Sequence, residues 1–347
     1  MNSYREDTTG FKFGKKLFTN IKNPLRKIFF PVIYSYPGYI LYDFIQRLNG
    51  NRKDRRRFYN KLGYYPDLKN PKSFNEKILW KKIYDRNPLL PVVSDKYGVR
   101  QYLKQVIGEN EAEKILIPLF FVTSDPVRIP FEVLSEEYVI KPNHGSGMII
   151  LAENIEGQKR FTFPRRKKDN IFFDCVDTKN EIIKTCKYWL SKPYHFQMRE
   201  WAYQKIERKI IIERLLRDNS GKISNEYKFT IFHGKCDQIT VWYDRFTDLT
   251  MGRYTPEWDF INVKGEGIKI ATCKKKPENL QSMINLAELL GKPFDYVRVD
   301  LILCDNHIYF GELTNYTAGG TIIFDPASYD FELGAKWRVA HRYWKLV

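Results

Sequence analysis

The sequence predicts a protein that mixes α-helices and β-strands, in an α+β or α/β arrangement. Three observations support this class. Residues 296–303 form a short run rich in β-branched and apolar residues, which is typical of a strand. Residues 277–290 carry apolar side chains at helical spacing, which predicts an amphipathic helix. Hydrophobic residues make up 43% of the 347-residue chain, enough for the cores of two or three domains.

Residues 1–60 form a basic, aromatic N-terminal segment with 13 Lys and Arg against 4 Asp and Glu. They supply more than half of the net charge of +17, which predicts an anionic partner. Aromatic side chains near these charges suit a membrane surface: Phe29, Phe30, Tyr34, Tyr36 and Tyr39. We therefore expect either helices that associate peripherally with an anionic membrane or a basic helical lid that packs on the main domain.

Three further regions follow along the chain. Residues 61–135 are expected to form a small α/β region with a helix from Phe74, a helix over residues 97–107 after Ser94-Asp95-Lys96, and a strand over residues 115–122. Residues 136–210 are expected to form a subdomain with strands over 137–141 and 148–152. Residues 211–347 are expected to be strand-rich, with extended segments over residues 209–214, 227–233, 237–243, 296–303 and 308–313.

A glycine loop joins the strands over residues 137–141 and 148–152. Because a strand rather than a helix follows it, the loop is neither a P-loop nor a Rossmann turn. Gly145 and Gly147 allow the backbone to present N–H groups to an anion, and Lys141 adds a point charge. A plain hairpin turn is the alternative. Residues 159–168 hold six basic side chains in ten, which predicts a solvated loop or a lid over an anion.

Asp300 and Glu312 lie twelve residues apart on two consecutive predicted strands. A two-residue turn would place them on opposite faces. They face each other only if the connection is the three-residue loop Asp305-Asn306-His307, or if a bulge interrupts one strand. Two adjacent carboxylates repel each other, so the pair suits a bound cation such as Mg²⁺. The alternative is a surface hairpin with unrelated acids, although residues 297–303 are too apolar for a fully exposed strand.

Several classes of protein are excluded or disfavoured. The five cysteines are scattered without a CxxC pair, which argues against a zinc site and predicts a reducing, cytoplasmic setting. We expect no secretory signal and no membrane span, because residues 28–44 are too short and contain Pro31, Pro37 and Gly38. The five histidines lack triad or metal spacing. No RNA-binding signature appears, so no nucleic-acid partner is expected.

The order of the motifs resembles an ATP-grasp enzyme, and more closely the TupA-like ATP-grasp group found in bacterial surface-polysaccharide gene clusters. The resemblance covers roughly residues 70–335. Five phrases carry it: Phe74-Asn75-Glu76-Lys77, Tyr84-Asp85-Arg86-Asn87-Pro88, Lys141-Pro142-Asn143-His144-Gly145-Ser146-Gly147, Glu226-Tyr227-Lys228-Phe229 and Gly311-Glu312-Leu313-Thr314. It implies an ATP-grasp fold, in which two α+β subdomains clasp ATP. Residues 136–210 would be the lid subdomain, and residues 211–347 the C-terminal subdomain with the magnesium site.

The resemblance also implies roles for individual residues. Lys96 and Lys141 match the lysines that hold ATP phosphates, and Arg298 matches the basic residue near the transferred phosphoryl group. The loop that closes on the phosphates matches Gly145, Ser146 and Gly147, and the hinge that meets the adenine matches Glu213, Arg214, Leu215 and Leu216. Asp300 and Glu312 match the magnesium ligands.

Two positions need separate comment. Many ATP-grasp enzymes end this motif with Glu-x-Asn, whereas Thr314 stands here and Asn315 follows it, so both are candidate ligands and the number of metal ions stays open. The acceptor side matches Lys228, Arg245 and Arg253, which could hold an anionic sugar or form structural ion pairs.

The implied activity is an ADP-forming carboxylate–amine ligase. It would use ATP and Mg²⁺ to join an amino acid or other amine to a uronic-acid carboxyl, as part of capsule, O-antigen or related polymer synthesis. Two alternatives stay open. One is a glycosyltransferase of the same pathway, although the region of Asp300 lacks an Asp-x-Asp motif. The other is a basic binding protein without catalysis.

Overall fold

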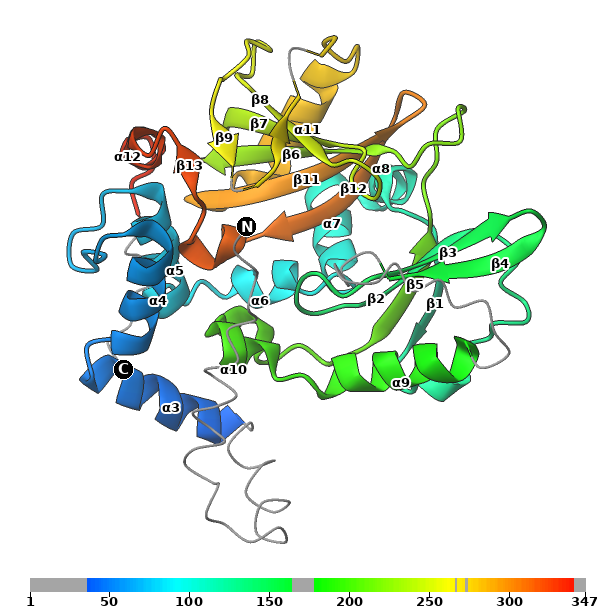
Figure 1. The fold of residues 1–347 in the computed structure, drawn as a ribbon, viewed down its shortest axis with the longest axis horizontal. Helices are drawn as coiled ribbons and strands as arrows, with labels where there is room; N and C mark the ends of the chain where they lie inside the picture. The colour runs from blue at the N-terminus through cyan, green and yellow to red at the C-terminus, as the bar shows by residue number, and fades with distance from the viewer. Residues whose placement is uncertain (1–35, 164–177, 266, 272–273, 340–347) are drawn as a thin grey trace, which may run out of the picture.

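The computed structural model describes residues 36–163, 178–265, 267–271 and 274–339 (Figure 1). Two sheets, each flanked by helices, form the body of the molecule, which confirms the predicted mixture of helices and strands. The five-stranded sheet has the order β1-β5-β2-β3-β4, and the six-stranded sheet has the order β10-β8-β7-β6-β11-β12. Two further short strands, β13 and β9, form a two-stranded sheet of their own.

The five-stranded sheet is antiparallel. Its strands are β1 (Leu119–Thr123), β2 (Tyr138–Pro142), β3 (Ile150–Ile155), β4 (Gln158–Thr162) and β5 (Ile210–Arg214). Apolar side chains such as Ile140, Ile150 and Ile212 form its core against helix α9 (Thr178–Ser191), which contributes Ile182 and Trp189. Because β1 pairs with β5, the region before residue 136 shares this sheet with the predicted lid.

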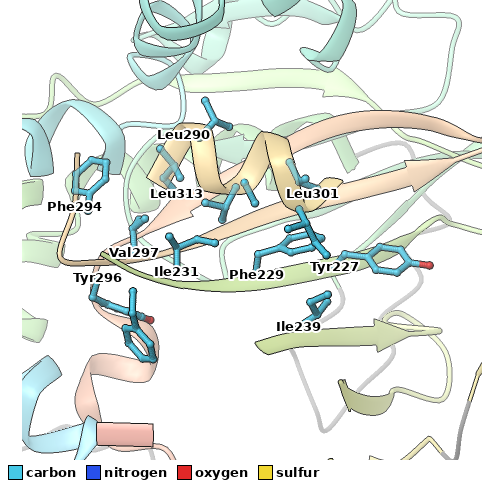
Figure 2. Close-up of a cluster of buried hydrophobic side chains, with 14 of the residues drawn as sticks. Tyr227, Phe229, Ile231, Ile239, Leu290, Phe294, Tyr296, Val297, Leu301 and Leu313 are labelled. Carbon is cyan, nitrogen blue, oxygen red and sulfur yellow. The ribbon is translucent and has the colours of Figure 1, made fainter. Parts of the chain in front are cut away.

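The six-stranded sheet carries the largest core. Its strands are β6 (Asn225–Phe232), β7 (Lys235–Tyr243), β8 (Thr250–Tyr254), β10 (Lys269–Ile270), β11 (Tyr296–Cys304) and β12 (His307–Thr314). Alternate residues of these strands pack against helix α11 (Leu280–Gly291), as Figure 2 shows for Phe229, Ile231, Val297 and Leu301. The period of two therefore turns intervening residues of β6, β7, β8 and β11 toward the cleft.

Helices connect and flank the sheets. They are α3 (Tyr36–Leu48), α4 (Arg52–Leu62), α5 (Phe74–Tyr84), α6 (Leu89–Ser94), α7 (Val99–Ile107), α8 (Glu109–Ile115), α10 (Tyr194–Met198) and α12 (Ser328–Ala335), with single 3₁₀ turns η1 (Pro126–Arg128), η2 (Trp201–Tyr203) and η3 (Thr317–Gly320), and the short strands β9 (Lys264–Gly265) and β13 (Phe324–Asp325). A capping box of Ser73 and Glu76 fixes the predicted start of α5 at Phe74. Within the described residues, no helix combines the length and apolar character needed to cross a membrane.

The helix and the strand expected in residues 94–122 both start later than predicted. Ser94 ends α6 instead of starting the next helix, because the Asp95 side chain accepts a hydrogen bond from the N–H of Tyr97 and the following helix starts at Val99. The strand expected from residue 115 starts at Leu119, since α8 extends to Ile115. Residues 1–35, with Phe29, Phe30 and Tyr34, and residues 164–168 of the basic run lie outside the described residues.

The described part of the N-terminal segment packs on the main body through a buried ion cluster. Arg199 is 2% exposed and follows α10. Its guanidinium donates to Asp43 Oδ1 of α3, with Nε at 2.9 Å and Nη2 at 2.7 Å, and to Asp54 Oδ2 of α4. Nη1 also donates to Asn51 Oδ1 at 2.8 Å. The helical packing that the sequence offered as one reading is therefore present over residues 36–60.

We predict that Arg199→Met will lower the free energy of unfolding by about 3 kcal/mol or more, because it leaves the buried carboxylates of Asp43 and Asp54 without their main cation. Urea unfolding measures this difference. Arg214→Met is the matched control: Arg214 is 43% exposed and pairs with exposed Glu136, so its loss should cost less than about 1 kcal/mol. Equal losses in the two variants would contradict the prediction.

Candidate functional site

A cleft of 470 Å³ lies between the two sheets and takes lining residues from both. This volume is within the range of ligand pockets, roughly 300–1,000 Å³. The five-stranded sheet contributes Lys141 and Glu213, and the six-stranded sheet contributes Asp300 and Glu312. The cleft is lined by seven cationic side chains and four carboxylates, so its excess charge is positive: Lys96, Lys141, Arg214, Lys228, Arg245, Arg253 and Arg298 against Glu213, Glu226, Asp300 and Glu312.

The β11–β12 hairpin places Asp300 directly opposite Glu312. The expected three-residue loop is wrong: His307 pairs with Cys304, and the turn is the two-residue Asp305-Asn306, whose residues both have positive φ, 47° and 62°. This is the backbone form favoured in two-residue hairpin turns. The bulge that the sequence left as the other possibility supplies the extra residue, because the register shifts between Asp300 and Leu301 and leaves Gly311 without a partner.

A row of five residues crosses the cleft face of the six-stranded sheet. Glu312 pairs with Asp300, Asp300 with Lys228, Lys228 with Thr240, and Thr240 with Arg253. Neighbouring strands are about 4.8 Å apart. Three such spacings, about 14 Å, separate the backbone at Asp300 from the backbone at Arg253. The register thus places the acidic pair at one end of the row and a cation at the other.

The acidic pair is held by cations on the same face. Arg298 donates from Nε to Asp300 Oδ1 at 2.6 Å and from Nη2 to Asp300 Oδ2 at 2.7 Å, and Nη2 also reaches Glu312 Oε1 at 3.1 Å. Lys228 Nζ donates to Asp300 Oδ2 at 2.7 Å and to Glu226 Oε2 at 2.6 Å. Shielding from solvent raises the pKa of Glu312, but Lys96, Arg298 and Lys228 outweigh it and hold that pKa far below its usual range.

Lys96 connects the glycine loop to the acidic pair. Its Nζ donates to the carbonyl oxygen of Gly145 at 2.7 Å and lies 3.6 Å from Glu312 Oε2. Burial lowers the pKa of Lys96, and Glu312 opposes that effect. Gly145 has φ of 76°, and a Cβ there would lie 2.7 Å from Met148 Cε, so the loop requires glycine at this position. Ser146 and Gly147 line the cleft directly.

Lys141 and Glu213 lie on the side of the cleft where the resemblance predicts the hinge. Lys141 Nζ lies 2.5 Å from Glu213 Oε2, and Arg100 Nη1 lies 3.5 Å from Glu213 Oε1. Beyond Glu213, the N–H groups of Arg214 and Leu215 donate to the carbonyl oxygens of Pro118 and Glu137, both at 3.0 Å. The hinge strand is therefore fixed to the rest of the molecule by backbone hydrogen bonds.

An apolar wall adjoins this hinge. Its lining side chains are Ile117, Val139, Ile149, Leu215, Leu216, Ile223 and Ile302. Such a surface suits the flat face of a heterocyclic base, whereas the cations beyond it suit phosphates. The predicted hinge residues Leu215 and Leu216 belong to this wall.

The acidic pair fits one Mg²⁺ held jointly with phosphate oxygens. Asp300 and Glu312 share one face, and the Glu312 side chain is 36% exposed toward the cleft. No group of three or more His, Cys, Asp or Glu side chains in the described ranges could hold a metal alone, so phosphate and water would complete the coordination. Thr314 Oγ1 donates to Glu312 Oε1 at 2.9 Å and lies beside the pair. Asn315 is not brought there, because its amide nitrogen donates to Leu90 O and Ser94 Oγ.

The three acceptor-side cations differ in their partners. Lys228 pairs with Asp300 and Glu226, and Arg245 pairs with Glu226. Arg253 is 7% exposed and donates to Thr240 Oγ1 at 3.1 Å and Val263 O at 3.3 Å. No ion pair joins Arg253 to a carboxylate among the described residues. Burial lowers the pKa of Arg253 to about 10.

One residue that lines the cleft, Trp242, was not part of any sequence motif. Trp242 lies beneath Lys228 and Arg245, with their cationic groups 4.4 Å and 5.2 Å from its ring centroids. Asn143, which belongs to the glycine-loop motif without an expected role of its own, does not line the cleft; it fixes the base of the loop, because its Nδ2 donates to Asp95 Oδ1 at 2.8 Å. Alternation along β7 could have found Trp242, since Gln238, Thr240 and Trp242 all line the cleft. His144 does not line it; burial lowers its pKa to about 3, so it is neutral.

Comparison with known proteins finds a family model and a set of solved structures that each match most of the chain. Residues 76–338 match the family model described as TupA-like ATPgrasp. No curated protein matches the chain. Among solved structures, the chain is similar to the D-alanine–D-alanine ligase of Bacillus anthracis (16% identity, 67% of this chain and 60% of that chain, TM-score 0.36) and to that of Helicobacter pylori (13%, 76% and 65%, 0.37). It is also similar to the ATP-grasp ligase PsnB in complex with a precursor variant, Mg and ADP (11%, 71% and 58%, 0.35). The chain thus spans about 60% of the length of the first of these ligases.

We predict that the stabilising effect of Glu312 depends on pH. Because the folded state lowers its pKa, the stabilisation is fully present above the ordinary value of 4.5 and is lost as the pH falls below it. The difference in unfolding free energy between wild type and Glu312→Gln should therefore be largest near pH 7 and shrink from about pH 4.5 downward. Urea unfolding at several pH values measures it. Exposed Glu257→Gln is the control, and a difference that does not change with pH would contradict the prediction.

Proposed function

Because the chain belongs to the TupA-like ATP-grasp family, we propose that it is an ATP-dependent ligase that joins a carboxylate to an amine through an acyl phosphate. The observation that carries the proposal is the cross-strand arrangement of the cleft. Asp300 and Glu312 face a glycine loop and two lysines, and an apolar wall adjoins them. These are the groups that a nucleoside triphosphate requires: an apolar site for the base, cations for the phosphates, and carboxylates for Mg²⁺.

The first step transfers the γ-phosphoryl group to the acid. A carboxylate oxygen attacks the γ-phosphorus, the bond between that phosphorus and the β,γ-bridging oxygen breaks, and ADP leaves. This reaction needs charge neutralisation and in-line positioning more than proton transfer. Lys96 and Lys141 would neutralise phosphate oxygens from the loop side. Arg298, which already contacts both carboxylates, would face the transferred group.

The residues of the acidic pair would hold Mg²⁺ through Asp300 and the exposed oxygen of Glu312, with Thr314 as a neighbouring hydroxyl. The bound ion would offset the charge of the phosphate oxygens that these carboxylates would otherwise repel. Arg298 and Lys228 hold the Asp300 carboxylate in place before the nucleotide binds. Most of the site is thus arranged in advance of the reaction.

The second step forms the amide. The amine nitrogen, after losing a proton, attacks the carbonyl carbon of the acyl phosphate, and the bond from that carbon to the phosphate oxygen breaks. Inorganic phosphate leaves and the amine's second proton passes to solvent or to the phosphate. ADP, phosphate and the amide are therefore the products.

We infer that the acid is an anionic sugar, a uronate, which would place its carboxyl beside Arg298 and a further anionic or polar group near Arg253. Arg253 supports this because its buried guanidinium contacts Thr240 Oγ1, Val263 O and, at 5.2 Å, the ring of Phe324, but no described carboxylate neutralises it, so it can pair with an anionic ligand. Trp242 adds an aromatic surface on the same side of the cleft. The resemblance to the TupA-like group supports an acceptor from bacterial capsule, O-antigen or another surface polysaccharide.

A direct test measures ADP and phosphate release from the full chain with Mg–ATP and panels of uronates and amines. The uronates include free, nucleotide-linked and lipid-linked forms, and the amines include the amino acids. The proposal expects release that requires both an acid and an amine, together with a product whose mass equals acid plus amine minus water. Release of a nucleoside diphosphate from a sugar donor without ATP would instead indicate a glycosyltransferase.

We predict that Lys141→Met combined with Asp300→Asn lowers kcat/KM for ATP-dependent ligation by about 100-fold or more, because the pair removes a phosphate cation and a metal ligand. Asp248→Asn is the control, since Asp248 is 75% exposed and lies outside the cleft. If the double variant turned over ATP as fast as the control and the wild type, that result would contradict the proposed site.

For the acceptor, we predict that Arg253→Met raises KM for the uronate by about 10-fold or more, whereas KM for ATP stays within about twofold, because a charge-assisted hydrogen bond to the acid is lost. Arg253→Lys should recover part of the effect. Urea unfolding of Arg253→Met should show a loss of no more than about 1 kcal/mol, since no ion pair with a described carboxylate is broken. A large stability loss with an unchanged uronate KM would make Arg253 structural and leave the ligase activity itself untouched.

A further inference from the structure

Helix α3 presents an apolar face to solvent. Five large apolar side chains occupy it, with exposed fractions between 43% and 71%: Ile40, Leu41, Phe44, Ile45 and Leu48. Their spacing of one, three, one and three residues places them along one side of the helix. The other side is inward, since Tyr39 and Asp43 are buried. A contiguous exposed patch of this kind marks an interaction surface rather than chance exposure.

The two helices α3 and α4 carry mostly positive charge. Residues 36–62 contain seven Lys and Arg and two acids, Asp43 and Asp54. Both carboxylates are buried against Arg199, and Asp43 also pairs with Arg47 at 2.8 Å, so neither adds negative charge to the exposed surface. Arg52, Arg56 and Lys61 of α4 are exposed, next along the chain from the apolar face. The preceding 35 residues add seven more Lys and Arg against two acids.

We propose that the apolar face of α3 docks on the surface of an anionic lipid membrane. Its five side chains would enter the boundary between headgroups and acyl chains, and the basic side chains of α4 would meet lipid phosphates. The inner face of the cytoplasmic membrane is the location that we propose for this contact. This inference does not rest on the ligase activity, since it uses no residue of the cleft.

Charge favours a membrane over other occupants of the face. Two copies of this helix pair would bring two positively charged surfaces together, which opposes a homodimer through this face. A nucleic acid would satisfy the cations and leave the apolar side chains in water. An anionic bilayer satisfies both the apolar face and the surrounding charge, which is the combination that interfacial helices use.

The test is co-sedimentation of the full chain with vesicles of phosphatidylcholine alone or mixed with phosphatidylglycerol. We expect binding to the mixed vesicles, little binding to phosphatidylcholine, and a decrease with added salt. Leu41→Ser/Phe44→Ser/Leu48→Ser should lower the partition coefficient by about 10-fold or more. The matched control is Val127→Ser/Val133→Ser/Leu289→Ser, which removes equally exposed apolar side chains elsewhere and should bind as the wild type does.

Circular dichroism and melting temperature establish that each variant folds. If the α3 triple variant does not fold, Arg52→Glu/Arg56→Glu replaces it and should likewise reduce binding to the mixed vesicles. Three outcomes overturn the proposal: no binding of the wild type, equal binding of the α3 and control variants, or a change in oligomeric mass in the α3 variant without loss of vesicle binding. The last outcome would assign the face to a second copy of the chain.

Discussion

The cleft depends on one extra residue in β12. From the turn up to Leu301 and Phe310, β11 and β12 pair in the register that a two-residue turn imposes. Continued without interruption, that register would direct Glu312 away from Asp300 and turn Leu313 into the cleft. Gly311 is the extra residue. After it, the side chains of β12 point to the opposite faces from those that the uninterrupted register would give them. A Cβ at this position would lie 3.0 Å from the carbonyl oxygen of Asp300, so glycine permits the close approach of the two strands.

The same register determines the electrostatics of the site. Asp300 and Glu312 are placed together on a largely buried surface, which is unfavourable unless cations neutralise them. Arg298, Lys228 and Lys96 provide that neutralisation from three different elements, at distances of 2.6 to 3.6 Å. Because the cations of the cleft outnumber its carboxylates, the arrangement can accept a further anion. Arg253, three strands away, is the cation whose charge the described carboxylates leave uncompensated.

The strands and the candidate residues on them could be predicted from patterns within short stretches of sequence. Period-two alternation and the order of motifs identified Arg298, Asp300, Glu312 and both strands that carry them. They could not choose between a longer loop and a bulge, since both satisfy an even spacing. Alternation also explains Asn315, which follows Thr314 and therefore faces the opposite side. The contacts of Arg199 could not be predicted. Arg199 and Asp43 are 156 residues apart, and no pattern within a short stretch of sequence indicates that they pair.

The N-terminal helices show how a buried contact can shape an exposed surface. Sequence alone offered two readings of the first 60 residues, a packed lid or a membrane-surface segment, as if one excluded the other. Within residues 36–60, packing is achieved by turning the two carboxylates inward to Arg199. This inward orientation of Asp43 and Asp54 removes their negative charge from the outer surface and leaves that surface basic. The five apolar side chains of α3 stay exposed to solvent. The ion cluster that anchors the helices to the body is therefore also what would make their outer face complementary to an anionic bilayer.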